Sequence, residues 1–121
     1  MKANKTHLTW ALLVISFLIT SCLSPALLRE AAYTPGIYVG SGQGLRGAIN
    51  VRLEISTGGI VDIEIVGHRE TAFPGLAAME ELLEMVLEMG STDLDFISGA
   101  TFSSRGFLEA VDDALRRAAV Q

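Results

Sequence analysis

The chain has 121 residues, of which 50% are hydrophobic and 19% charged, with a formal net charge of −5 and a single cysteine. This length accommodates one compact domain, and the acidic balance argues against a nucleic-acid partner. A single cysteine excludes a framework of internal disulfides, so the domain has to be held together by its hydrophobic core.

The N-terminal segment has the pattern of an export signal. Lys2 and Lys5 precede an apolar run over residues 8–19 that is too short for a comfortable membrane span. The run leads into Thr20-Ser21-Cys22, which resembles the end of the lipobox of bacterial lipoproteins, where the cysteine becomes the lipidated first residue. We therefore expect residues 1–21 to be a lipoprotein signal peptide and Cys22 to be the lipidation site. The alternatives are a plain signal peptide and an uncleaved anchor.

The next part of the chain predicts a tether and an antiparallel sheet. Residues 22–34 lack strand alternation and are expected to form the tether, so the domain is assigned to residues 35–121. A short apolar strand with a glycine-rich connection is followed by two alternating runs, 48–55 and 60–66, which predict a meander of three or four strands. The residues expected to point inward are Ile49, Val51, Leu53, Ile55, Val61, Ile63 and Ile65.

The glycines of the connection formally satisfy the dinucleotide-binding pattern G-x-G-x-x-G, at Gly42, Gly44 and Gly47. That fingerprint requires a helix directly after the glycines, whereas the residues that follow alternate as a strand does. We therefore interpret this segment as a hairpin or bulged turn and not as a nucleotide site.

Two amphipathic helices are expected to cover the apolar face of the sheet, which gives an α+β fold with both helices packed on one face. The first spans residues 76–89 and ends at Gly90, with an acidic stripe that could dock a basic redox partner but is more simply a solvated face. Its expected inward residues are Met79, Leu82, Leu83, Val86 and Met89. The second begins near Ser104 and buries Phe107, Ala110, Val111, Ala114, Leu115 and Ala118.

A hydroxyl-rich segment, residues 95–104, leads into the second helix. Its hydroxyl groups belong to Ser98, Thr101, Ser103 and Ser104, all of them candidate helix caps, while Gly99 and Ala100 allow another group to approach the backbone. A helix that starts near Ser104 would direct its free N–H groups toward Thr101, and phosphate is a natural ligand of such a helix end. The simpler interpretation is a loop followed by a well-capped helix.

The residues Asp95, Ser98, Gly99, Ala100, Thr101 and Ser103, in this spacing, resemble position for position the flavinylation motif of the FMN-binding domain family. This family includes flavin subunits of sodium-translocating and Rnf-type oxidoreductases, and the resemblance extends over residues 35–119. It implies that FMN is the cofactor and that a flavin transferase esterifies the FMN phosphate to Thr101, which would make the chain a phosphoprotein. It also implies that Asp95 helps to present the motif to the transferase and its metal.

A second segment, His68 to Thr71 followed by Pro74-Gly75, resembles a stretch that lies near the bound flavin in the same family. Glu70, Thr71 and Gly75 are therefore further candidates for FMN binding. The chain departs from the commoner pattern at Ala72 and Phe73, because relatives often have the proline directly after the threonine. Without the resemblance, a lone histidine in a connecting loop is an ordinary solvated or capping residue.

These expectations together describe an exported flavoprotein, anchored to the membrane by lipid, that relays electrons from a membrane donor to an extracytoplasmic acceptor. No catalytic residue and no metal ligand are assigned in the chain, so an electron-transfer protein is expected instead of a free-standing enzyme. The alternatives are a flavin-bearing component of a separate extracytoplasmic reductase and a flavin-free structural lipoprotein.

Overall fold

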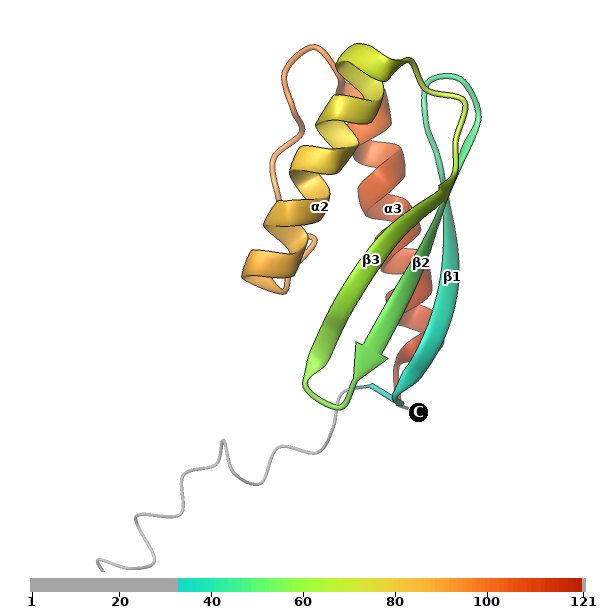
Figure 1. Cartoon of the computed structure of the whole chain (residues 1–121), viewed down its shortest axis with the longest axis vertical. Helices are drawn as coiled ribbons and strands as arrows, with labels where there is room; N and C mark the ends of the chain where they lie inside the picture. Colours follow the sequence, from blue (N-terminus) through green and yellow to red (C-terminus); the bar gives the residue numbers. More distant parts are fainter. Residues whose placement is uncertain (1–32, 121) are drawn as a thin grey trace, which may run out of the picture. The chain divides into compact units, whose positions relative to one another are not determined.

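The computed structural model describes residues 33–120. The expected signal peptide, Cys22 and most of the tether therefore lie outside the described residues. The elements run in the order β1 (Gly36–Gln43), β2 (Ala48–Ser56), β3 (Gly59–Gly67), an irregular turn η2 (Ala72–Leu76), α2 (Ala77–Met89) and α3 (Thr101–Ala118) (Figure 1).

The sheet is the predicted antiparallel meander, with three strands in the order β1-β2-β3. The central strand β2 alternates as the sequence predicts, because Ile49, Val51 and Leu53 are 0% exposed and Ile55 is 3% exposed. The glycine-rich connection between β1 and β2 is a turn closed by a hydrogen bond of 2.9 Å from the Gly44 N–H to the Gly47 carbonyl. The hairpin interpretation of this segment is confirmed.

The prediction for β3 was wrong at Val61, which is 55% exposed. On β2, Glu54 pairs with Asp62 and Ile55 pairs with Ile60, so Val61 is an extra residue in a β-bulge. The bulge shifts the alternation by one residue, and Ile60 instead of Val61 packs against the core. Ile63 and Ile65 keep their expected inward positions.

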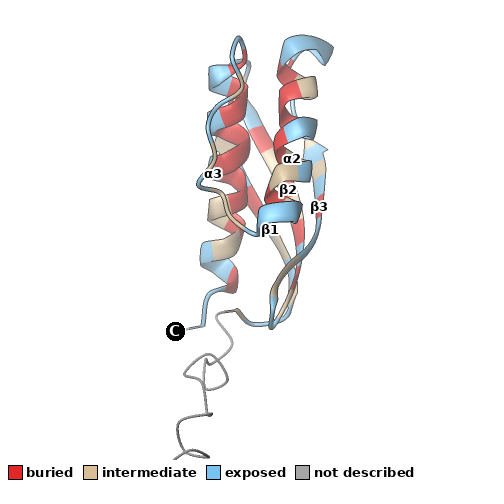
Figure 2. Ribbon diagram, turned by 90° about the vertical axis from the view of Figure 1, so that its left-hand side faces the viewer, coloured by how far each residue is buried: buried red, intermediate tan, exposed pale blue. Residues whose placement is uncertain are grey.

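Both helices cover the same face of the sheet, as predicted, which makes the fold α+β (Figure 2). α2 buries Met79, Leu82 and Val86, while α3 buries Phe107, Val111 and their neighbours along one stripe. Met89 was expected inward but is 62% exposed, because it is the last residue of α2, directly before the left-handed Gly90 (φ 65°). Within residues 33–120, neither helix is long and apolar enough to cross a membrane.

α3 lies against β1 at backbone contact distance. A Cβ atom at Gly40 or Gly42 would come within 2.0 Å of a carbonyl oxygen of α3, and one at Gly106 would come within 2.7 Å of the Gln43 backbone. Only glycine leaves room for this approach. The contact therefore explains why Gly106 lies inside α3, where glycine is otherwise unfavourable. The contact places the first turn of α3 beside the turn between β1 and β2.

Candidate functional site

The hydroxyl-rich segment enters α3 through a tight turn. The Ala100 N–H donates to the Ile97 carbonyl at 3.0 Å, which closes the turn. Gly99, the third residue of this turn, has φ 82°, and Ser98 does not have a positive φ, because only glycines do among the described residues. A turn with positive φ at its third residue alone is a type II turn, which favours glycine there. The turn delivers the chain into the helix at Thr101.

The helix begins at Thr101 and not near Ser104 as the sequence predicted. The residue before it, Ala100, has no side-chain oxygen, and no side chain caps the helix. The first backbone bond of the helix runs from the Ser104 N–H to the Ala100 carbonyl at 2.9 Å. The N–H groups of Thr101, Phe102 and Ser103 therefore precede the hydrogen-bonded part of the helix and are available to a ligand.

The serine hydroxyls expected to be caps have other roles. Ser103 donates its hydroxyl hydrogen to the Glu70 carboxylate, and the Ser104 hydroxyl accepts the Ile97 N–H at 3.0 Å. Ser98 is exposed. The capping prediction was wrong because these hydroxyls hold neighbouring segments against α3, which leaves the end of the helix open.

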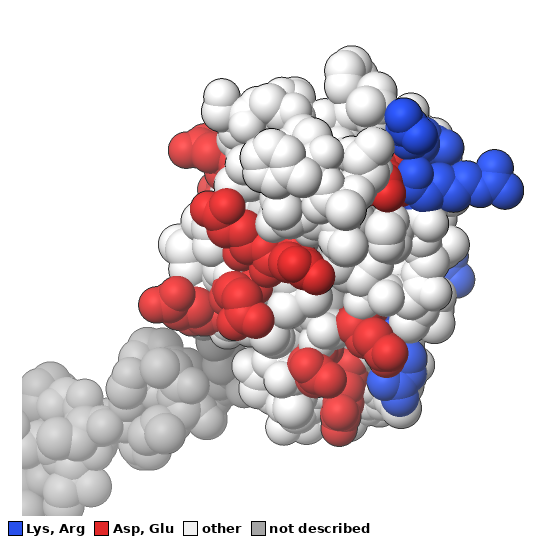
Figure 3. Space-filling model, turned by 45° about the horizontal axis from the view of Figure 1, so that its top comes forward, with Lys and Arg blue, Asp and Glu red and all other residues white. Residues whose placement is uncertain are grey.

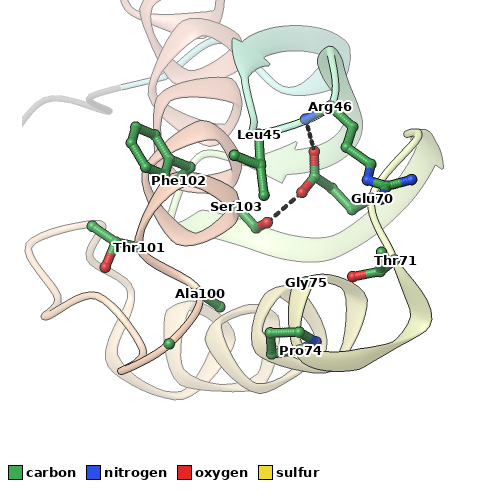
Figure 4. Close-up of a pocket in the computed structure, with 11 residues that line it drawn as sticks. Leu45, Arg46, Glu70, Thr71, Pro74, Gly75, Ala100, Thr101, Phe102 and Ser103 are labelled. Carbon is green, nitrogen blue, oxygen red and sulfur yellow. Dashed lines mark hydrogen bonds between the residues drawn. The ribbon is translucent and has the colours of Figure 1, made fainter.

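Glu70 connects the parts of the site (Figure 4). The residue is 8% exposed; one carboxylate oxygen accepts the Arg46 N–H at 2.9 Å and the other accepts the Ser103 hydroxyl. Gly75 lies beside it, because a Cβ there would come within 3.0 Å of the Glu70 Cβ and 3.1 Å of the Ser103 hydroxyl oxygen. Glu70 thus joins the β1–β2 turn, η2 and the start of α3.

A pocket lies where these three segments meet (Figure 4). Of the residues predicted to bind FMN, the ones that line it are Glu70, Thr71, Gly75, Gly99, Ala100, Thr101 and Ser103. Asp95 and Ser98 are exposed and lie outside the pocket lining. The inserted residues Ala72 and Phe73 are taken up in η2, and Pro74 and Gly75 still reach the pocket.

Leu45, Arg46 and Phe102, which were not predicted from the sequence, also line the pocket. Leu45 is 64% exposed and Phe102 51% exposed, so both present apolar surface at its mouth. The Arg105 guanidinium lies 5.1 Å from the centre of the Phe102 ring, a cation–π contact. The sequence signal for these residues was an apolar and a basic residue inside a glycine-rich turn, where small polar residues are usual.

The pocket fits the phosphate end of a nucleotide better than the whole molecule. It encloses about 60 Å³, whereas sites that bury a drug-sized ligand have about 300–1,000 Å³. Three free N–H groups and the positive end of the α3 dipole suit an anion at its base. A ligand held there by phosphate would keep its larger part outside, against Leu45 and Phe102.

Charge is unevenly distributed around the described domain. Figure 3 shows acidic side chains spread over the left and lower parts of the visible face, with basic side chains along its right edge, some of them beside acidic ones. The predicted acidic stripe of α2 is exposed and includes Glu80, Glu84 and Glu88, none of which lines the pocket. In residues 33–120, no group of three or more His, Cys, Asp or Glu side chains is arranged to hold a metal ion.

Comparison with known proteins connects this geometry to a family. The family described as the FMN-binding domain matches residues 44–116, more than half of the chain. An uncharacterized protein of Treponema pallidum (strain Nichols) is 32% identical over 94 residues, which cover 78% of this chain and 25% of that protein.

Two further relatives carry names that describe reductases. The NADH:acrylate oxidoreductase of Vibrio harveyi is 30% identical over 69% of this chain and 8% of its own length. The urocanate reductase of Eggerthella lenta is 30% identical over 64% of this chain and 13% of its own length. The matches thus span a quarter or less of each of these three relatives.

Proposed function

The chain belongs to the FMN-binding domain family and has FMN as its cofactor, and from this premise we propose that it is an exported, lipid-anchored electron carrier with FMN joined covalently to Thr101. The flavin, when bound, supplies the redox chemistry. The protein supplies the attachment point, the orientation of the cofactor and the electrostatic environment.

The position of Thr101 carries the proposal. It is the first residue of α3, it is exposed, and it lines the pocket beside the three uncapped N–H groups. An ester at its hydroxyl would hold the phosphate next to the helix end that can receive it. The diester keeps one negative charge, which the helix dipole stabilises by about 0.3–1 kcal/mol, so the covalent bond has to supply most of the retention.

Asp95 supports the transferase part of the proposal. Its carboxylate is exposed and does not line the pocket, a position suited to contact with a modifying enzyme instead of the flavin. Replacement of Asp95 by asparagine is therefore expected to reduce flavin attachment without unfolding the domain.

The small size of the pocket favours an electron carrier. About 60 Å³ leaves no enclosed space for a second organic molecule beside the flavin, so a redox partner would meet the cofactor from outside. The names of the relatives favour a second candidate, a flavin-bearing component of a separate extracytoplasmic reductase. Purification of the chain from its native membrane would separate the two, because a stable reductase complex would co-purify with it.

The anchor rests on the sequence around Cys22. Two lysines, a short apolar run and a cysteine in lipoprotein context support export and lipidation. Covalent attachment of the cofactor suits that location, because a dissociated flavin would diffuse away from an extracytoplasmic protein. Incorporation of a labelled fatty acid should be lost in Cys22→Ala, and unchanged labelling would rule out this anchor.

The attachment site is tested by co-expression with a flavin transferase, followed by intact-mass measurement and in-gel fluorescence. Wild type should gain one FMN, Thr101→Ala none, and Ser103→Ala most of it. Thr57→Ala provides a matched control, because Thr57 is an exposed threonine in the β2–β3 turn. Fluorescence that persists in denatured Thr101→Ala would place the attachment elsewhere.

A further inference from the structure

Among the residues that the structure describes, Arg46 is the only cationic one that lines the pocket. Its backbone is fixed by the hydrogen bond of 2.9 Å from its N–H to Glu70. Four of the other arginines in residues 33–120, namely Arg52, Arg105, Arg116 and Arg117, pair with carboxylates, whereas the Arg46 guanidinium forms no ion pair there. A fixed backbone and an unpaired charge leave this side chain available to a ligand.

The guanidinium and the attachment residue belong to different ends of the pocket. In Figure 4, Thr101 lies on one side of the pocket and Thr71 on the other, and the Arg46 side chain extends toward the Thr71 side. Ala100, Pro74 and Gly75 lie between them. A flavin esterified at Thr101 would have its phosphate at the α3 end. Because the pocket is too small to enclose the ring, the ring would lie outside it, over the exposed lining residues, which include Leu45, Arg46 and Phe102.

We propose that Arg46 contacts the edge of the flavin ring and favours its reduced form, an inference that rests on the proposed attachment at Thr101. Two-electron reduction with uptake of one proton adds one negative charge to the ring. An opposite charge nearby stabilises that charged form, and charge next to the ring is a recognised means of tuning flavin potentials. Glu70, the other charge in the lining, has both carboxylate oxygens engaged by protein donors.

The test compares midpoint potentials of the flavinylated full chain, measured by spectroelectrochemical titration with dithionite as reductant. Arg46→Gln should weaken the preference for the reduced form about tenfold, a fall of about 30 mV for a two-electron couple. Arg46→Lys should recover most of the potential, because it keeps the charge. Arg52→Gln, which alters an arginine on the outer face of the sheet paired with Glu64 at 3.6 Å, should leave it unchanged.

Two further measurements make the result decisive. High salt should reduce the difference in potential between wild type and Arg46→Gln, because it screens the exposed guanidinium; a difference that does not change with salt would contradict a charge effect. Arg69→Gln removes a nearby exposed charge that does not line the pocket, so its effect should be smaller than that of Arg46→Gln.

An unchanged potential in Arg46→Gln, or an equal shift in Arg69→Gln, would overturn the contact. Reduced attachment with an unaltered potential in Arg46→Gln would assign the guanidinium to the phosphate and would also overturn it. Failure of the wild type to accept flavin is a different outcome, because it contradicts the proposed function and not the role of Arg46.

Discussion

The two ends of α3 are constructed in opposite ways. At its C-terminal end, the Ala118 carbonyl accepts the Thr34 N–H at 2.8 Å, the Ala119 N–H donates to the Leu115 carbonyl at 3.0 Å, and Tyr33 pairs with Ala119. At its N-terminal end, alanine occupies the cap position and no side chain satisfies the first N–H groups.

The backbone chemistry of the two ends is equivalent, since every helix leaves unpaired donors at one end and unpaired acceptors at the other. The difference therefore comes from the surrounding chain. Tyr33 and Thr34 pair with the C-terminal end, which is therefore the closed end. At the N-terminal, open end, the nearby hydroxyls of Ser103 and Ser104 are engaged by other groups. In this fold the candidate site lies where the protein leaves its own backbone unsatisfied.

The largest expected effect on stability comes from a change in the close contact between α3 and β1, which positions the helix. Gly106→Ala would place a Cβ 2.7 Å from the Gln43 backbone, and such overpacking costs about 1–3 kcal/mol, more than the roughly 1 kcal/mol that alanine gains in helix propensity. Urea denaturation should show the loss, and flavin attachment should fall as the start of α3 moves. Gly58→Ala is the control, because its nearest neighbour would be 3.8 Å away. Equal stability of the two variants would contradict the close contact.

A smaller effect on stability is expected when a capping side chain is added at the open N-terminal end of α3. Ala100→Ser supplies the missing cap, which should stabilise the unmodified protein by about 1 kcal/mol and compete with phosphate for the free N–H groups. The melting temperature should therefore rise while flavin attachment falls. Ala119→Ser, at the end that is already closed, should change neither quantity. A rise in attachment in Ala100→Ser would show that the open end is not the phosphate site.

The smallest effect is expected at the closed end. The pKa of Asp113 is lowered, first by the Ser41 N–H that its carboxylate accepts at 3.0 Å. Burial opposes this as the next largest effect, and Arg117 and Arg116 lower the pKa further. A lowered pKa contributes stability above the unfolded value of about 3.9, and this is lost as the pH falls through the folded value.

Asp113→Asn should therefore cost less than about 1 kcal/mol at neutral pH, as is usual for ion pairs near the surface, and the difference should vanish in acid. Unfolding free energies of wild type and variant across acid pH would measure it. Asp62→Asn, on an exposed residue of β3, should leave the acid dependence in place.

The sheet could be predicted from the sequence where the alternation of apolar and polar residues lies within a single strand. β2 alternates without interruption, so each of its inward residues was placed correctly. The bulge at Val61 could not be foreseen, because it arises from the pairing of β3 with β2 and not from the sequence of β3 alone. In that pairing Ile60 lies opposite Ile55 and Asp62 lies opposite Glu54, which leaves Val61 without a partner. A one-residue shift of register reverses which side chains face the core.

The site was predictable only in part, for a similar reason. The hydroxyl-rich segment and the segment from His68 to Gly75 were found separately, but the bond between Ser103 and Glu70 spans 33 residues and has no local signature. Serine propensity for helix caps placed the helix start too late. Arg46 and Leu45 were missed because their turn approaches α3 only through the glycine contacts along β1.

The contact between α3 and β1 also has a consequence for biosynthesis. The Ser41 N–H and the Asp113 carboxylate are 72 residues apart in the chain, whereas β1, β2 and β3 are joined by two short turns and can pair as soon as they leave the ribosome. The pocket is lined by residues of the β1–β2 turn, of residues 70–75 and of the start of α3, so it does not exist until α3 has been made and has docked. A partly synthesised chain therefore has no assembled pocket in which a transferase could attach the flavin. The yellow colour of a modified molecule would then indicate that its folding had been completed.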